Sequence, residues 1–174
     1  ILYKPHKHVY MATIPGMKER TIVCNSLSKT YSITGWRLGY TQANPEISDR
    51  IKKVHDFLTV GAAHPLQEAA VAGLKFGDDY YKDLQEKYTH KRNLFLKGLD
   101  DIGLTHTTPQ GAYYVLIDIS EFGYESDLAF SEILAKKVGV GAVPGSSFFK
   151  EHENRYIRLH FAKKDDTLNE ALDR

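Results

Sequence analysis

Apolar side chains recur every three to four residues in several long stretches of the chain, a spacing typical of amphipathic helices. Ile47, Ile51 and Val54, for example, would share one face of a helix that begins after Asn44-Pro45. The pattern predicts helices at residues 46–57, 65–76, 80–99 and 127–137, the last with Asp127 as its cap, and from residue 165 to the end of the chain.

Short apolar or alternating runs between these helices predict β-strands. The β-branched run at residues 21–24 indicates a short buried strand, and residues 36–40 alternate like a second strand. In the last predicted strand the alternation puts Arg158 on the polar face, opposite Ile157 and Leu159. Further strands are expected at residues 103–105, 112–118, 139–144 and 155–162.

The interleaving of helices and strands predicts an α/β fold. A chain of 174 residues is long enough for one compact domain or for two units that share a core. The helical pattern is interrupted at Gly77-Asp78-Asp79, so we expect a domain boundary near residues 75–82.

Charge and cysteine content exclude several classes of function. The chain has 23 basic and 22 acidic side chains, a net charge of +1, which provides no field to attract nucleic acid or an anionic membrane. Cys24 is the single cysteine, which fits a reducing compartment, and its apolar neighbours predict a buried, unreactive thiol. No membrane-spanning run or signal peptide is visible. We therefore expect a cytoplasmic protein with no nucleic-acid or membrane partner.

The candidate chemistry lies between the first two predicted strands. Ser26 and Ser28 precede Lys29, and Arg37 follows the lysine eight residues later. A lysine amine forms a Schiff base with an aldehyde once its pKa falls, and partial burial beside a second cation lowers that pKa. Arg37 offers a planar fork for phosphate, and the serines offer hydroxyl donors. From the residues alone, the stretch fits either a site for a phosphorylated aldehyde or a solvated polar loop.

The sequence Ser-x-x-Lys followed by Thr-Gly-Trp-Arg-Leu-Gly-Tyr resembles the lysine signature of the class I and II aminotransferases, fold-type I enzymes of the aspartate aminotransferase superfamily. In that family the lysine carries pyridoxal 5'-phosphate as a Schiff base, while the serine and the arginine hold its phosphate. The resemblance assigns these roles to Lys29, Ser26 and Arg37, with Ser28 as a further cofactor-binding hydroxyl. Penicillin-binding proteins and β-lactamases also contain Ser-x-x-Lys, but their Ser-Asp-Asn and Lys-Thr-Gly tripeptides do not occur here.

A second motif lies near the C-terminus. The order tyrosine, aliphatic, arginine, aliphatic at residues 156–159 resembles the family strand whose arginine grips the substrate α-carboxylate. On its own, a strand arginine also fits pairing with a neighbouring acid. The resemblance implies that Arg158 binds the carboxylate through two parallel hydrogen bonds. Residues 109–114 and 144–148 are similar to the family's Gly-Ala-aromatic segment beside the substrate and its proline-glycine loop at the domain junction.

The resemblance implies that residues 1–78 are the end of the large pyridoxal-phosphate-binding domain and residues 79–174 the small C-terminal α/β domain. It also implies a homodimeric aminotransferase that exchanges an amino group between an L-amino acid and a 2-oxo acid. The family's ring-nitrogen carboxylate and stacking aromatic would precede Ile1, so we expect this C-terminal half alone to be inactive.

Two other interpretations remain open. A carbon–sulfur lyase or an aminocyclopropane-carboxylate synthase would keep the same lysine and arginines, and product analysis separates these enzymes. An aminotransferase-like effector-binding domain of a transcription regulator would need a DNA-binding segment outside this chain. No metal site is predicted, because His6 and His8 share a face in an extended segment but have no third ligand nearby. His64 is interpreted as a polar residue at a helix start.

Overall fold

The computed structural model describes residues 1–151 and 153–174, and it divides into two compact units. One unit comprises His8–Tyr81, and the other comprises Ile1–Lys7 together with Lys82–Arg174. The first seven residues therefore pack with the C-terminal part of the chain. Among the described helices, none combines the length and the apolar character needed to cross a membrane.

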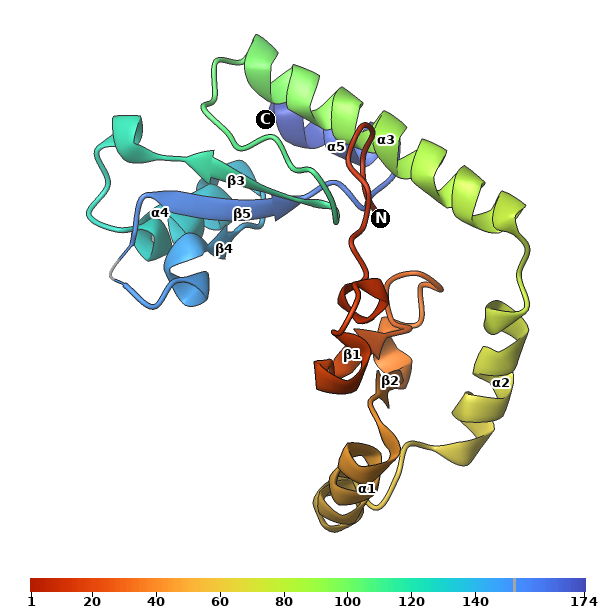
Figure 1. The fold of residues 1–174 in the computed structure, drawn as a ribbon. Coiled ribbons are helices and arrows are strands. Elements are labelled where there is room, and N and C mark those ends of the chain that lie inside the picture. Colours follow the sequence, from red (N-terminus) through yellow and green to blue (C-terminus); the bar gives the residue numbers. More distant parts are fainter. Residues whose placement is uncertain (152) are drawn as a thin grey trace. The chain divides into compact units, whose positions relative to one another are not determined.

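The unit at His8–Tyr81 contains a two-stranded hairpin and two helices (Figure 1). Its strands pair antiparallel, with Val23 opposite Gln42 and Ser26 opposite Gly39. The elements are β1 (Val23–Ser26), β2 (Gly39–Gln42), α1 (Pro45–Thr59) and α2 (His64–Leu74), with short 3-10 helices at Met11–Thr13, Lys18–Arg20 and Thr34–Trp36.

The prediction of a buried strand at residues 21–24 is wrong. The strand begins at Val23, and the three residues that follow Val23 within it are exposed. A sheet of only two strands leaves much of its surface uncovered, so Cys24 is exposed rather than buried. The second strand begins at Gly39 instead of residue 36, because a 3-10 turn and a left-handed residue at Arg37 precede it.

The predicted helix after Asn44 is confirmed. The Asn44 side chain accepts a hydrogen bond from the backbone N–H of Ile47 at 2.9 Å, and Pro45 occupies the first helical position. The apolar face of α1 is only partly covered within this chain. Phe57 is 92% exposed, and Leu58 is also largely exposed.

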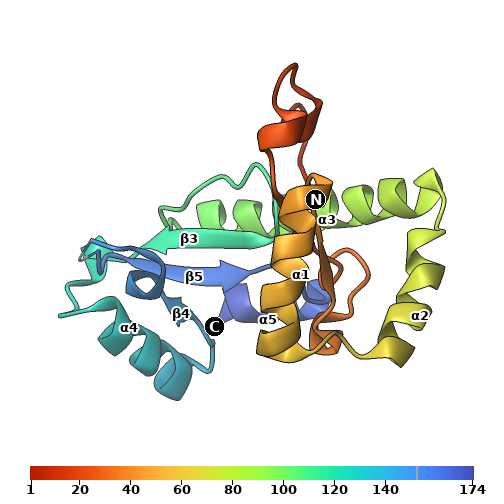
Figure 2. The same ribbon diagram turned by 60° about the horizontal axis from the view of Figure 1, so that its bottom comes forward.

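The other unit contains a three-stranded antiparallel sheet in which β5 lies between β3 and β4 (Figure 2). Its strands are β3 (Tyr114–Asp118), β4 (Val143–Pro144) and β5 (Tyr156–His160). The helices are α3 (Asp78–Asp101, which begins in the first unit), α4 (Asp127–Ile133, continued by a π-helical turn at Leu134–Val138) and α5 (Asp165–Asp173). Residues 120–122 and 145–148 form 3-10 turns.

Two predictions in this unit need correction. Residues 103–105 form no strand, although the adjacent His106 makes an isolated bridge to Ile117. Asp127 is not the cap of α4, because the Ser126 side chain accepts the hydrogen bond from the backbone N–H of Ala129 at 3.1 Å. Asp127 is instead the first helical residue, and its carboxylate is used elsewhere.

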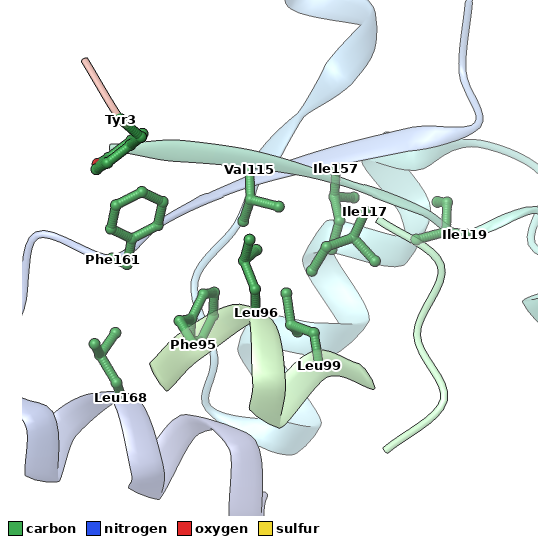
Figure 3. Close-up of a cluster of buried hydrophobic side chains, with 10 residues drawn as sticks. All are labelled: Tyr3, Phe95, Leu96, Leu99, Val115, Ile117, Ile119, Ile157, Phe161 and Leu168. Atoms are coloured by element: carbon green, nitrogen blue, oxygen red, sulfur yellow. The ribbon is translucent and has the colours of Figure 1, made fainter. Parts of the chain in front are cut away.

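The core of this unit forms between α3, α5 and one face of the sheet (Figure 3). The alternation predicted for β5 is confirmed, since Ile157 is buried while Arg158 is only partly buried. Tyr3 is fully buried; its hydroxyl donates to the Ala112 carbonyl at 2.5 Å. The buried cluster comprises Tyr3, Phe95, Leu96, Leu99, Val115, Ile117, Ile119, Ile157, Phe161 and Leu168.

The packing predicts a large stability difference between two leucines. Leu99 of α3 is 2% exposed, whereas Leu128 of α4 is 56% exposed. Leu99→Ala should lower the free energy of unfolding by about 2–5 kcal/mol, because it leaves a cavity in the core. Leu128→Ala should change it by about 0.5 kcal/mol or less. Urea unfolding of the whole protein, followed by circular dichroism, measures both, and equal losses would contradict this account of the core.

Candidate functional site

The predicted cofactor residues lie in or beside the loop that joins β1 to β2. Ser26 ends β1, Ser28 and Lys29 lie in the loop, and Arg37 stands two residues before β2. Backbone hydrogen bonds close this loop: the N–H of Leu27 donates to the Leu38 carbonyl at 3.1 Å, and the N–H of Ile33 donates to the Ser28 carbonyl at 3.0 Å. The loop is therefore held in one shape by its own backbone.

Lys29 and Arg37 converge on Thr34. The Lys29 ammonium donates to Thr34 Oγ1 at 3.5 Å, and Arg37 Nη1 donates to the Thr34 carbonyl oxygen at 2.9 Å. Neither cation forms an ion pair with an acid among the residues described. Two positive groups close to one residue, without a counter-anion, favour binding of an anionic ligand.

The two serines have different contacts. The Ser26 hydroxyl accepts from the Ser28 N–H at 3.1 Å and donates to the Leu38 carbonyl at 3.4 Å, a long and therefore weak hydrogen bond. Ser28 is buried, and its carbonyl accepts from the Thr34 hydroxyl at 3.3 Å. Both residues shape the loop, and Lys29 between Ser28 and Thr30 remains exposed.

Arg37 has an unusual backbone conformation. Its φ of 56° and ψ of 42° lie in the left-handed region, which costs a residue with a Cβ atom about 1–2 kcal/mol. Glycine would adopt this conformation freely, yet the position holds an arginine. Backbone strain of this kind concentrates at ligand-binding and catalytic positions. The geometry thus supports a use for the guanidinium that outweighs the local cost.

A tyrosine cluster that the sequence analysis missed supports the loop next to Lys29. The Tyr80 hydroxyl donates to the Thr30 carbonyl at 2.7 Å, and the Tyr80 ring stacks on Tyr31 with centroids 6.1 Å apart. The hydroxyls of Tyr31 and Tyr81 lie 2.8 Å apart. Burial, followed by this hydrogen bond, raises the pKa of Tyr31 to about 12. A Cβ atom at Gly73 would lie 2.9 Å from the Tyr31 ring, so the close contact requires glycine there.

Arg158 occupies the middle of the sheet in the other unit. It lies on β5, opposite Leu116 of β3 and Val143 of β4. Its guanidinium carbon is 4.3 Å from the ring centre of Tyr114 and 3.8 Å from that of Phe148. No acid among the described residues pairs with it, so the alternative of a structural ion pair has no support. Two aromatic rings hold the guanidinium while its N–H donors stay available.

His160, two residues after Arg158 on β5, does not add a second positive charge. Burial, Lys163 and Arg158 all lower the pKa of His160, so its imidazole is neutral at pH 7. Burial also raises the pKa of Tyr113, whose ring lies 4.6 Å from that of Tyr114. Arg158 is consequently a charged group of β5 itself that is available to an anion.

The donor set fits a phosphorylated aldehyde together with a carboxylate. In one unit, Lys29 offers an amine for the aldehyde, and Arg37 with Ser26 offers donors for the phosphate. In the other unit, Arg158 offers a fork for a carboxylate. Among the described residues, no group of three or more His, Cys, Asp or Glu side chains is arranged to hold a metal ion.

Comparisons with known proteins agree with this chemistry. A family model described as aminotransferase class I and II matches residues 4–174. The chain is 34% identical to the methionine aminotransferase of Escherichia coli, over 100% of this chain and 45% of that protein. It is also 34% identical to the aspartate aminotransferase of Pyrococcus abyssi, over 99% of this chain and 44% of that protein.

A solved structure gives the same result for the fold. N-succinyldiaminopimelate aminotransferase from Mycobacterium tuberculosis superimposes with a TM-score of 0.92 at 30% identity, covering 99% of this chain and 46% of that one. The α/β fold is confirmed as that of a C-terminal part of such proteins. The chain spans less than half the length of the relatives it matches.

The left-handed backbone at Arg37 predicts an inverted preference between glycine and alanine. Arg37→Gly should be more stable than Arg37→Ala by about 1 kcal/mol, because only glycine accepts this φ without strain. Lys53, an exposed residue of helix α1, is the matched control. There Lys53→Gly should be the less stable variant by about 1 kcal/mol. Urea unfolding without added ligand measures the four variants, and equal stability of the two Arg37 variants would refute the strain.

Proposed function

The chain belongs to the class I and II aminotransferases, and we propose that the whole protein exchanges an amino group between an L-amino acid and a 2-oxo acid. Enzymes of this family depend on pyridoxal 5'-phosphate. The observation that carries the proposal is the convergence of Lys29 and Arg37 on Thr34, with no neutralising acid among the described residues. The activity is assigned to the whole protein, because these 174 residues match less than half of each relative.

We assign the cofactor-binding roles to the β1–β2 loop. Lys29 is the residue to which the cofactor aldehyde would be attached, and Arg37, Ser26 and Ser28 would hold its phosphate. When bound, pyridoxal phosphate supplies an electron sink for the negative charge that develops at the substrate Cα. The Ser26 hydroxyl could exchange its 3.4 Å contact with the Leu38 carbonyl for a phosphate oxygen, since that contact is weak.

Lys29 is proposed as the general base and general acid. Its Nζ would take the proton from the substrate Cα as a general base and then deliver it to the cofactor carbon as a general acid. The only hydrogen bond of this ammonium among the described residues is the 3.5 Å contact with the Thr34 hydroxyl, so no acid competes for it. The bond from Tyr80 to the Thr30 carbonyl restrains the backbone directly after the lysine, which supports a fixed position for the amine.

Arg158 is proposed to bind the substrate α-carboxylate. A planar guanidinium can donate two parallel hydrogen bonds to a carboxylate and so fix the orientation of the amino acid. The contacts with Tyr114 and Phe148 restrict the guanidinium before the substrate arrives. Less rotational freedom is then lost on binding.

The side chain of the substrate is not assigned. By name, the relatives reported above act on methionine, aspartate and N-succinyldiaminopimelate, and two of them share the same 34% identity with this chain. We also propose a homodimer, supported by the exposed apolar residues Phe57, Leu58 and Val60 at the end of α1, and a cytoplasmic location. The 174 residues alone are proposed to be inactive.

Borohydride reduction tests the lysine assignment. After incubation with pyridoxal phosphate and reduction, peptide mapping of the whole protein should find the cofactor on Lys29, because a Schiff base there becomes a stable secondary amine. Lys29→Ala should abolish this adduct. Lys52→Ala should retain it, since Lys52 is an exposed residue of α1 that lies 3.4 Å from Asp49.

Labelling spread evenly over surface lysines, or unchanged in Lys29→Ala, would refute the assignment. If Lys29 is labelled, product analysis separates an aminotransferase from a carbon–sulfur lyase. Transamination yields a new amino acid and a 2-oxo acid, whereas a carbon–sulfur lyase releases a thiol and ammonia. The same labelling experiment on residues 1–174 alone tests whether this segment forms the adduct without the rest of the protein.

Replacement of Arg158 tests the carboxylate site. Arg158→Gln should lower kcat/KM by about 10–100-fold, because a charge-assisted hydrogen bond to the substrate is lost. Cofactor absorbance should not change. The control is Arg155→Gln, since Arg155 directly precedes β5 but pairs with Glu153 at 3.3 Å. Steady-state kinetics on the whole protein would contradict the assignment if both variants had the same small effect.

A further inference from the structure

Asp127 is a buried carboxylate that no cation neutralises among the described residues. Asp127 is only 2% exposed, and burying a carboxylate is costly unless hydrogen bonds satisfy its oxygens. Oδ1 accepts from the Leu128 N–H at 2.9 Å and from the Ser146 hydroxyl at 3.2 Å. Oδ2 accepts from the Ser146 N–H at 2.6 Å. Since Ser126 caps α4, the carboxylate of Asp127 is directed mainly to Ser146.

Ser146 lies in the turn that follows β4. This turn, Gly145–Phe148, begins directly after β4. β4 has two residues, which pair with Arg158 and Ile157 of β5. Gly145 packs directly on β5, because a Cβ atom there would lie 2.5 Å from the Tyr156 carbonyl oxygen. The pairing of β4 with β5 and the packing of Gly145 on Tyr156 fix the beginning of the turn. The hydrogen bonds to the Asp127 carboxylate fix the next residue, Ser146.

Phe148 ends this turn and covers Arg158. Its ring centre is 3.8 Å from the guanidinium carbon of Arg158, yet Phe148 is 48% exposed. Burial in a core therefore does not hold the ring in place. The opposing ring, Tyr114, belongs to the sheet itself. The position of Phe148 depends on the backbone of the turn, which is anchored two residues earlier at Ser146.

We propose that Asp127 is a positioning residue for the substrate carboxylate site: through Ser146 it holds the turn that keeps Phe148 on Arg158. The inference rests on the proposed role of Arg158 in binding the substrate carboxylate. Asp127 does not touch the substrate. Its effect is to pre-orient the guanidinium, so that less side-chain freedom is lost when the carboxylate binds.

Asp127→Asn in the whole protein is the first test. Asparagine keeps the size of the side chain but has one acceptor oxygen for the N–H and hydroxyl of Ser146. KM for the best amino acid of a panel should rise about threefold to tenfold, the range expected when a cation–π contact is weakened, while kcat changes less. Cofactor absorbance and affinity should stay unchanged. The control is Glu132→Gln on the same helix, an exposed residue that pairs with Lys136.

A double-mutant cycle with Phe148→Leu distinguishes positioning from general stability. If Asp127 acts through Phe148, Asp127→Asn should raise KM by less than about twofold in the Phe148→Leu background, because coupled residues are not additive. A purely structural role would lower the melting temperature and leave KM unchanged. An unchanged KM in Asp127→Asn, or the full rise repeated in the Phe148→Leu background, would overturn the proposal.

Three further results keep the outcomes separate. If Asp127→Asn does not fold, Ser146→Ala decides, because it removes one bond to Asp127 and keeps the N–H: a rise in KM of about twofold supports the proposal, and no change overturns it. A wild-type protein that transaminates no amino acid would overturn the proposed function and this inference together. An active wild type impaired by Arg158→Gln but indifferent to Asp127→Asn would overturn the inference alone.

Discussion

The pleat of β5 couples the core of the C-terminal unit to the proposed substrate site. Successive side chains of a strand point to opposite faces, so burying Ile157 beneath the sheet necessarily directs Arg158 to the other face. Pairing with β3 on one side and β4 on the other fixes the register of Arg158 opposite Leu116 and Val143. A slip of one residue in this register would bury the guanidinium and expose the core residue. The stability of the unit and the placement of Arg158 therefore follow from the same constraint.

The lysine loop obtains its shape differently. Within the part of the chain that the structure describes, the hairpin of β1 and β2 has no third strand and little buried surface, so a core does not position Lys29. Backbone hydrogen bonds across the loop, the left-handed conformation of Arg37 and the bond from Tyr80 to the Thr30 carbonyl perform that task. Such a loop keeps its polar side chains accessible while its backbone is restrained, which suits a site that must receive a ligand.

The contacts of the proposed cofactor-binding and substrate-binding cations orient these side chains without neutralising them. Several exposed cations on helices pair with acids one helical turn away, as Arg50 does with Glu46, and these solvated pairs contribute little to stability. Lys29, Arg37 and Arg158 have no such partner among the described residues. Their contacts are a hydroxyl, a carbonyl and aromatic rings, which orient a cation without neutralising it. The local charge is left for anionic groups of a cofactor and a substrate.

The sequence by itself determined the α/β class, the helices, the alternation in β5 and the family, because periodicity and short motifs are local properties of the chain. Tertiary structure decided features that depend on distant residues. Cys24 is exposed because its sheet has two strands among the residues that the structure describes. The Asp127 carboxylate accepts hydrogen bonds from Ser146 instead of capping α4. Tyr80 reaches Thr30 from 50 residues away. Contacts of this kind leave no periodic signal in the sequence, since each depends on where the fold brings two separate segments together.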